Sequence, residues 1–250
     1  MVAKYKMIKE IVKFEEFNGD KTPLIPRIFV AYKYKSGSDN AWKQVDEDGN
    51  TTALLSSVDG NFTLIAKEQT DFYELKEFLN FFGYNSLVSN VPLSESAKSY
   101  SLFKYCGNEV SDSCFDFLVL DSRSTVSQYK KLHSLLFSDA QVDFDNWYCD
   151  FSKKIVNSDA IAVALTKGEN LLSVATAPMI YKNIAIISGV FTSGEFRSKG
   201  FSKATIYKLI KELKKCNVTE IYLWCEESLE EFYIKLGFQK VGCTYLETEF

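Results

Sequence analysis

The hydrophobic pattern is clearest between residues 184 and 215, where its period changes once. Ile184–Thr192 is β-branched and aromatic without a charge, which predicts a buried strand. Ser193–Gly200 is a polar turn with two glycines. Hydrophobic positions then recur with the period of ~3.6 residues that an amphipathic helix has. These positions are Ile206, Leu209, Ile210 and Leu213, opposite Lys203, Lys208, Lys211 and Lys214. The stretch therefore predicts a strand, a basic turn and a helix.

Before residue 110 the pattern predicts strands and one amphipathic helix. Residues 1–26 are charged and carry two prolines, which indicates a short helix and a loop. Arg27–Lys35 is strand-like, and Ser36–Asn50 is polar enough to be mostly loop. Thr51–Val58 and Phe62–Ala66 flank an Asp-Gly turn, which predicts a hairpin.

The predicted helix of this half follows Asp71. Asp71 and Glu74 have capping-box spacing, and Gly83 can end the helix. Its hydrophobic face is formed by Phe72, Leu75, Phe78, Leu79 and Phe82. Residues 85–113 are ambiguous, with a candidate strand at Ser86–Asn90 and serine-rich loops around it. We place a domain boundary near residue 110, which gives domains 1–110 and 111–250.

After this boundary the pattern becomes regular. It predicts the order β-α-α-β-β-β-α-β-α-β. The predicted elements are Phe115–Leu120, Val126–Phe137, Phe144–Val156, Ile161–Thr166, Leu171–Ala177, the 184–215 stretch, Glu220–Cys225, Ser228–Leu236 and a strand from Gln239. The fold class is α/β (α+β), with a mixed central sheet and flanking helices.

Composition and charge argue against a nucleic-acid-binding or membrane protein. The 250-residue chain is 46% hydrophobic, so it can bury a core, and its net charge is −4. An acidic balance gives no basic footprint for nucleic acid or anionic membrane. The first sixteen residues are charged throughout, so we expect no signal peptide. Uncharged runs stay below the ~18–20 residues of a membrane span.

Six cysteines and one histidine, His133, show no metal-ligand spacing. We therefore expect no metal site and a cytoplasmic protein with reduced thiols. A Cys–His catalytic pair is the alternative, but His133 falls in a predicted amphipathic helix and is expected to be structural.

The turn before the 201–215 helix has the chemistry of a phosphate site. Free N–H groups at a helix start point toward a ligand, the helix dipole favours negative charge, and glycine permits close approach. Arg197 and Lys199 add positive charge.

This turn also resembles a known family. Arg197-Ser198-Lys199-Gly200-Phe201-Ser202 is similar to the Arg/Gln-x-x-Gly-x-Gly/Ala signature of the GCN5-related N-acetyltransferases (GNAT), with Ser202 departing from the usual Gly or Ala. The run from Gly189 to Arg197 resembles the "GVYT–EYRGKGYA" form of one acyltransferase branch. The resemblance implies that acetyl-CoA is the acyl donor. It implies cofactor contacts at Val190, Phe191, Thr192, Arg197, Ser198, Lys199, Gly200, Phe201 and Ser202.

A second landmark lies one strand downstream. Residues 232–238, FYIKLGF, resemble the "LYEKLGF" that closes GNAT domains. The resemblance implies the acyl-CoA N-acyltransferase fold over about residues 113–250, and Tyr233 as the acid that protonates the departing thiolate. Glu226 stands where many members have an asparagine. It either repels the anionic cofactor or serves as base or binding group for an amine. Ser188 offers no base, so the base stays unassigned.

Two functions fit the resemblance. The first is transfer of an acetyl group from coenzyme A to an amine of a small molecule or protein, by direct attack. The alternative is a non-catalytic acyl-CoA-binding or sensing protein, and a purely structural protein with an inherited fold is a third reading. The oligomeric state is left open.

Residues 1–110 contain a segment whose pattern resembles the strand and helix near the end of the chain. Phe62–Tyr84 and Ile221–Phe238 both run strand, helix, glycine, aromatic. One hypothesis is that the N-terminal domain is a degenerate copy of the fold that does not bind coenzyme A, and chance similarity is the alternative. This alignment places Leu79 at the position of Tyr233.

Overall fold

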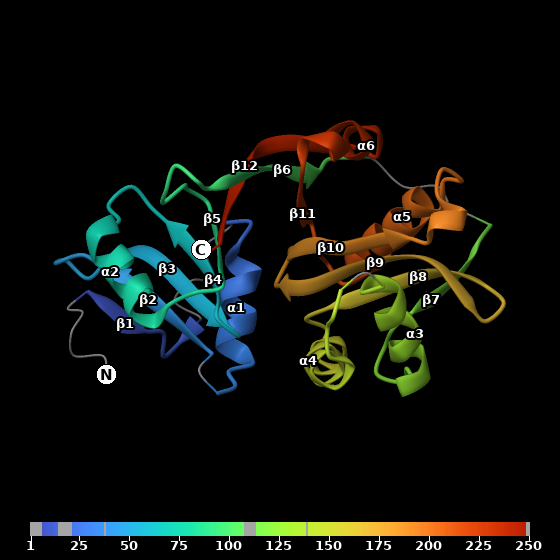
Figure 1. Ribbon diagram of the computed structural model, residues 1–250, viewed down its shortest axis with the longest axis horizontal. Helices are drawn as coiled ribbons and strands as arrows, with labels where there is room; N and C mark the ends of the chain where they lie inside the picture. Colours follow the sequence, from blue (N-terminus) through green and yellow to red (C-terminus); the bar gives the residue numbers. More distant parts are fainter. Residues whose placement is uncertain (1–6, 15–21, 38, 108–113, 139, 249–250) are drawn as a thin grey trace. The chain divides into compact units, whose positions relative to one another are not determined.

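The computed structural model describes residues 7–14, 22–37, 39–107, 114–138 and 140–248 (Figure 1). The chain divides into two compact units. Unit 1 is Met1–Phe103, Trp224–Glu230 and Lys240–Phe250, and unit 2 is Lys104–Leu223 and Glu231–Gln239. The predicted boundary near residue 110 lies within 108–113, outside the described residues, so the split at residue 110 stays a prediction.

Unit 1 is a mixed sheet with a helix on each face. Its elements are β1 (Ile8–Glu10), α1 (Ile25–Lys33), β2 (Asn40–Val45), β3 (Thr51–Val58), β4 (Asn61–Ala66), α2 (Phe72–Phe82), β5 (Ser86–Ser89), and most of β6 (Lys98–Tyr105) and of β12 (Phe238–Thr248). β1 to β4 form antiparallel pairs in chain order, β5 is parallel to β4, and β12 is antiparallel to β5.

The two faces of β4 meet different helices. Phe62 and Leu64 belong to the core that includes Leu75 and Phe78 of α2. Thr63, between them, accepts a hydrogen bond from α1. Because side chains alternate along a strand, α1 and α2 lie on opposite faces of this sheet.

The start of unit 1 differs from the sequence prediction. Arg27–Lys35 was expected to be a strand, but α1 spans Ile25–Lys33. Pro26 fits the first turn of a helix, where its missing N–H costs nothing, and Ile25, Ile28 and Ala31 follow a three-residue spacing that buries one face. The predicted loop at Ser36–Asn50 contains β2, and the predicted helix before residue 26 contains β1.

Unit 2 has α3 and α4 on one face of its sheet and α5 on the other (Figure 1). Its elements are β7 (Asp116–Val119), α3 (Val126–Leu136), α4 (Phe144–Val156), β8 (Ile161–Lys167), β9 (Asn170–Tyr181), β10 (Ile184–Thr192), α5 (Phe201–Lys215), β11 (Glu220–Cys225) and α6 (Glu230–Lys235), the last two shared with unit 1 at one end. β7 to β10 pair antiparallel in chain order, and β11 is parallel to β10. The predicted order of elements after residue 113 is confirmed.

The two units share a strand order. β8-β9-β10 is an antiparallel meander followed by α5 and a parallel strand, β11. β2-β3-β4 is likewise a meander followed by α2 and a parallel strand, β5. This order supports the hypothesis of a degenerate copy but corrects its register. α2 corresponds to α5, not to α6, because each of these two helices connects the last strand of a meander to the parallel strand beside it. A helix ended by glycine and an aromatic residue is too common a pattern to fix an alignment.

Candidate functional site

The second half of β10 departs from regular strand geometry. Its pairing with β9 shifts register between Ile186 and Ser188 and again between Ser188 and Phe191. Gly189 within this bulge has φ +59°, and a Cβ there would lie 3.0 Å from Leu136 Cδ2 on α3. Only glycine satisfies both the backbone angle and the close approach of the helix.

Val190–Thr192 lie beyond the parallel pairing of β10. In the described strands, that pairing joins Ile184–Ile186 to Glu220–Tyr222 and goes no further. On the other side, Phe191 and Thr192 still pair with Val174 and Ser173 of β9. One edge of this segment therefore offers backbone groups that an extended ligand with amides can pair with.

The turn that follows contains two residues with a left-handed backbone, Ser198 and Gly200. Ser198 and Gly200 have φ +61° and +79°, and the segment Gly194–Phe196 is a single 3₁₀ turn. A Cβ built on Gly200 meets no atom within 4 Å. Turns with left-handed residues of this kind can direct backbone N–H groups into an anion-binding concavity.

Helix α5 begins at this turn without a capping side chain. Its N-cap is Gly200, which has none to offer, and among the described residues no acceptor pairs with the amides of Ser198 to Lys203. By contrast, Asp71 caps α2, Thr125 caps α3 and Asp143 caps α4. The start of α5 thus keeps both its dipole and its N–H donors available to an anion.

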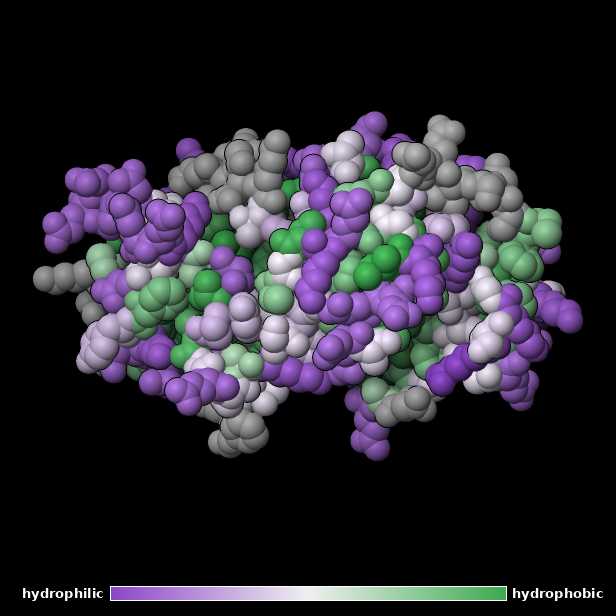
Figure 2. Space-filling view, turned by 90° about the horizontal axis from the view of Figure 1, so that it is seen from above, coloured by the Kyte–Doolittle hydropathy of each residue, from purple (hydrophilic) through white to green (hydrophobic). Residues whose placement is uncertain are grey.

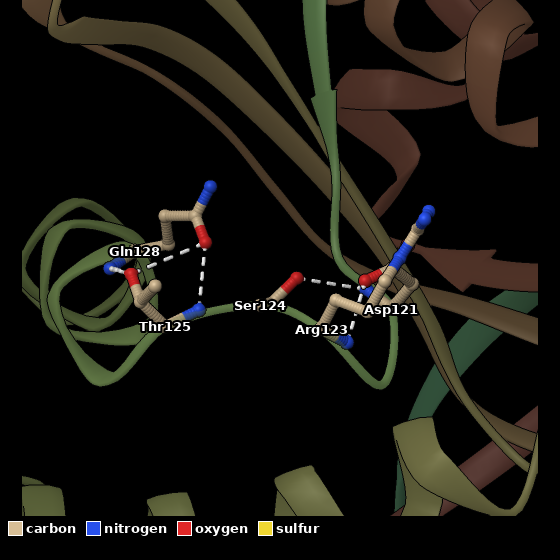
Figure 3. Close-up of polar contacts among 5 residues, drawn as sticks. All are labelled: Asp121, Arg123, Ser124, Thr125 and Gln128. Atoms are coloured by element: carbon tan, nitrogen blue, oxygen red, sulfur yellow. Dashed lines mark hydrogen bonds and ion pairs between the residues drawn. The ribbon is translucent and has the colours of Figure 1, made fainter.

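In contrast to α5, the start of α3 is capped by side chains (Figure 3). Thr125 N donates to Gln128 Oε1 at 2.7 Å, and Gln128 N donates to Thr125 Oγ1 at 3.4 Å. In the preceding loop, Asp121 accepts from Arg123 N at 2.8 Å and Nη2 at 2.9 Å, which lowers the pKa of Asp121. Protein groups occupy the donors of this helix, so it is not a candidate anion site.

The two basic residues of the turn are exposed. Arg197 Nε donates to Thr192 O at 3.2 Å, and its guanidinium lies 5.8 Å from the ring centroid of Phe191. Lys199 Nζ lies 5.3 Å from the ring centroid of Phe196. These contacts hold positive charge beside the turn while leaving it in solvent.

Ser202, the departure from the family signature, has its hydroxyl engaged inside the protein. Its Oγ lies 2.6 Å from Thr192 Oγ1, which lies 2.7 Å from Ser173 Oγ. Ser173 is fully buried, and Thr192 is buried as well. The chain of hydroxyls ties the start of α5 to β9 and β10, and it turns the Ser202 side chain toward the sheet.

Tyr233 lies in α6 and is buried, with 8% of its surface exposed. Its ring centroid is 5.7 Å from that of Phe238 and 5.1 Å from that of Phe232. The predicted role of Tyr233 as proton donor stays a prediction.

Glu226 lies beyond the end of β11, exposed, with its carboxylate 2.7 Å from Lys98 Nζ. This hydrogen bond raises the pKa of Lys98. The ion pair offsets the negative charge that made Glu226 unfavourable for an anionic cofactor. Its predicted role in substrate binding stays a prediction.

The Nε2 atom of His133 is buried without a hydrogen-bond partner among the described residues, so it is not paired with a thiol. All six cysteines are free, and burial raises the pKa of the Cys225 thiol to about 11, which keeps it protonated at neutral pH. The His133 ring packs between Phe144 and Trp147 of α4, with centroids at 5.4 and 5.1 Å. In the described part of the chain, no group of three or more His, Cys, Asp or Glu residues could hold a metal ion.

Neither a membrane-spanning helix nor a large hydrophobic patch is found in the part of the chain and on the face described next. None of the helices among the described residues is long and apolar enough to cross a membrane. On the face in Figure 2, hydrophobic areas are separated by hydrophilic residues rather than joined into one patch.

Sequence reasoning missed two features of this region, the β10 bulge and the hydroxyl chain. A glycine inside an apolar strand, as at Gly189, is the signal for a bulge. The hydroxyl chain could have been expected from Ser173 and Thr192, which lie in apolar predicted strands, because buried hydroxyls need hydrogen-bond partners.

Comparison with known proteins agrees with this geometry. Residues 126–238 match the model of the Acetyltransferase (GNAT) family. This match supports acetyltransferase-type activity. A search of curated proteins found no significant match to the chain.

Many solved structures share the fold at low identity. A GCN5-related N-acetyltransferase from Kribbella flavida has a TM-score of 0.61 at 10% identity, covering 89% of this chain and 93% of that one. A GNAT-family acetyltransferase from Colwellia psychrerythraea has a TM-score of 0.58 at 10% identity, covering 97% and 99%. A tandem GNAT protein from the clavulanic acid biosynthesis pathway has a TM-score of 0.57 at 8% identity, covering 96% and 98%. These likenesses establish the fold alone.

Proposed function

We propose that this protein transfers an acetyl group from acetyl-CoA to an amine by direct attack, since residues 126–238 match the model of the Acetyltransferase (GNAT) family. The observation that carries the proposal is the uncapped start of α5, where amides without an acceptor face a left-handed turn flanked by Arg197 and Lys199. The pyrophosphate of coenzyme A has the charge and the acceptors that such a backbone binds.

The rest of the donor fits the neighbouring strand. The amides of the pantetheine arm would pair with the open edge at Val190–Thr192, which brings the thioester toward the bulge at Gly189. Backbone N–H groups along β10 would stabilise the oxyanion that forms on the thioester carbonyl.

The reaction exchanges one bond for another. The amine nitrogen attacks the carbonyl carbon, a C–N bond forms, and the C–S bond breaks as the electron pair leaves with sulfur. Tyr233 would give its phenolic proton to the thiolate and recover one from solvent. The nitrogen loses its proton to a base that we leave unassigned. The acceptor is an amine of a small molecule or protein, and Glu226 is a candidate for binding it.

Unit 1 supplies no second donor site in this proposal. The helix of unit 1 that corresponds to α5 is α2, where Asp71 accepts from Tyr73 N and Glu74 N at 3.0 and 3.1 Å. A fixed carboxylate there occupies the donors and repels phosphate. Free thiols in both units support a cytoplasmic location.

Calorimetry with acetyl-CoA on the full chain tests donor binding, and release of free thiol with a panel of amines tests transfer. Saturable binding with amine-dependent thiol release is the expected result. Binding without release for any amine would favour the non-catalytic sensor, and no binding would exclude both.

A further inference from the structure

Thr192, the last residue of β10, contacts two parts of the turn that follows it. Its Oγ1 lies 2.6 Å from the Oγ of Ser202 in the first turn of α5. Its carbonyl oxygen accepts a hydrogen bond from Arg197 Nε at 3.2 Å. One buried residue therefore holds both the middle and the end of the segment between β10 and α5.

The hydroxyl of Thr192 is itself fixed by the sheet. Ser173 of β9 lies directly opposite Thr192, and their Oγ atoms are 2.7 Å apart. Val174, the neighbour of Ser173, belongs to the core beneath α3 and α4. Because side chains alternate along a strand, Ser173 and Thr192 point to the other face, on which α5 packs. Ser173 is fully buried, so the chain of hydroxyls is anchored in the core.

A count of protons gives this chain a direction. Each hydroxyl has one proton to donate, and a backbone carbonyl can only accept. Ser173 Oγ donates to Phe191 O at 3.2 Å. The proton of Thr192 then goes to Ser173, and the proton of Ser202 goes to Thr192. Each hydroxyl donates once in this order, and a buried polar network that is fully satisfied in this way adds rigidity.

The amides beside this chain have no internal bond that fixes their direction. Those of Ser198 to Lys203 donate to no acceptor among the described residues. A ligand that binds loosely held donors must order them at a cost in free energy, and donors already in place bind it more tightly. Gly or Ala at position 202, as in the family signature, would have no hydroxyl to reach Thr192. The link therefore depends on the residue in which this chain departs from the signature.

We propose that Thr192 is a positioning residue for the pyrophosphate of coenzyme A, acting through Ser202 and Arg197 on the amides of the turn. This inference rests on the donor-binding part of the proposed function. Because the proton of Ser202 points into the sheet, its hydroxyl adds no donor to the phosphate, and the side chain acts as an anchor. The hydroxyl chain thus sets how tightly the donor binds.

Calorimetry with acetyl-CoA on the full chain tests this role and needs no acceptor amine. Thr192→Val keeps the branched shape of the side chain and removes the hydroxyl, so we expect the Kd for acetyl-CoA to rise about tenfold. Thr192→Ser keeps the hydroxyl and should bind acetyl-CoA like the parent. Thr205→Val is the matched control, because Thr205 is also fully buried in unit 2 but its hydroxyl bonds Phe201 O within α5, at 2.8 Å.

A double-mutant cycle separates the link from the stability of the fold. Ser202→Ala removes the outer end of the chain, leaves Thr192 and Ser173 paired, and should also weaken acetyl-CoA binding. On this background Thr192→Val should add little, since the link is already broken. Absence of binding by the parent protein would overturn the proposed function together with this inference. If the parent binds, an unchanged affinity in Thr192→Val or Ser202→Ala, an equal loss in Thr205→Val, no rescue by Thr192→Ser, or additive losses in the double variant would each overturn this inference alone.

Discussion

At the scale of single residues, Gly200 decides whether the turn before α5 can hold a phosphate. We expect Gly200→Asp to weaken acetyl-CoA binding by about 100-fold or more, roughly 2.7 kcal/mol, because a carboxylate enters the space intended for an anion. Gly168→Asp is the matched control, since Gly168 also has positive φ and open space but lies in the β8–β9 hairpin. Calorimetry on both variants measures the effect, and equal affinities would place the donor elsewhere.

Tyr233 is the second residue whose side chain can be tested alone. Tyr233→Phe keeps the ring packed against Phe238 and removes the proton. We expect turnover to fall about tenfold or more while acetyl-CoA affinity changes little, because the lost interaction belongs to the transition state. Tyr222→Phe removes a hydroxyl that bonds Glu220 and serves as the control for a buried phenol. If turnover at saturating substrates is unchanged with chemistry rate-limiting, the acid is another group.

At the scale of elements, the bulge in β10 depends on Gly189. Gly189→Ala places a Cβ 3.0 Å from Leu136 and 3.1 Å from Thr176, at a backbone angle that costs an L-residue ~1–2 kcal/mol. We therefore expect urea unfolding to show at least that loss of stability. Gly194→Ala, at an ordinary φ with no atom within 4 Å, should unfold like the parent. Coincident midpoints for the two variants would contradict this account of the bulge.

Elements with strong local signals were predictable from sequence. The α5 period, the Asp59-Gly60 turn and the helices α3 and α4 all follow from spacing that tertiary contacts do not override. The turn Arg197–Ser202 was found because glycine and basic residues preceded an amphipathic helix. In α1, by contrast, β-branched and aromatic residues favour a strand locally, and burial of Ile25, Ile28 and Ala31 decided for a helix.

Features that depend on distant partners were not predictable. The Glu226–Lys98 ion pair joins residues far apart in the chain. Asp71 and Glu74 have capping-box spacing, yet only Asp71 caps α2. The Glu74 carboxylate accepts from Met7 N and Gln44 Nε2 instead, at 3.1 and 3.0 Å. Spacing identifies the candidates, and the packing of other strands decides which partner each side chain takes.

At the scale of the whole molecule, unit 1 is completed by the end of the chain. Tyr245–Thr248 of β12 pair with Ser86–Ser89 of β5. Glu247 is buried and accepts from Leu93 N at 2.7 Å and Ser94 Oγ at 2.8 Å. Charge-assisted hydrogen bonds of this kind are worth ~1.5–3 kcal/mol, a large part of the stability of a small domain.

We therefore expect residues 1–110 alone not to fold, although they contain most of the sheet of unit 1. Co-expression with residues 111–250 should restore a dispersed NMR spectrum of the labelled 1–110 fragment, because the second fragment supplies Trp224–Glu230 and β12. Co-expression with residues 111–239, which end before the Glu247 anchor, is the matched control and should not restore it. A dispersed spectrum of residues 1–110 by themselves would show that the N-terminal domain is independent of the C-terminal strand. It would then favour the sequence-based boundary near residue 110 over the division into units that exchange segments.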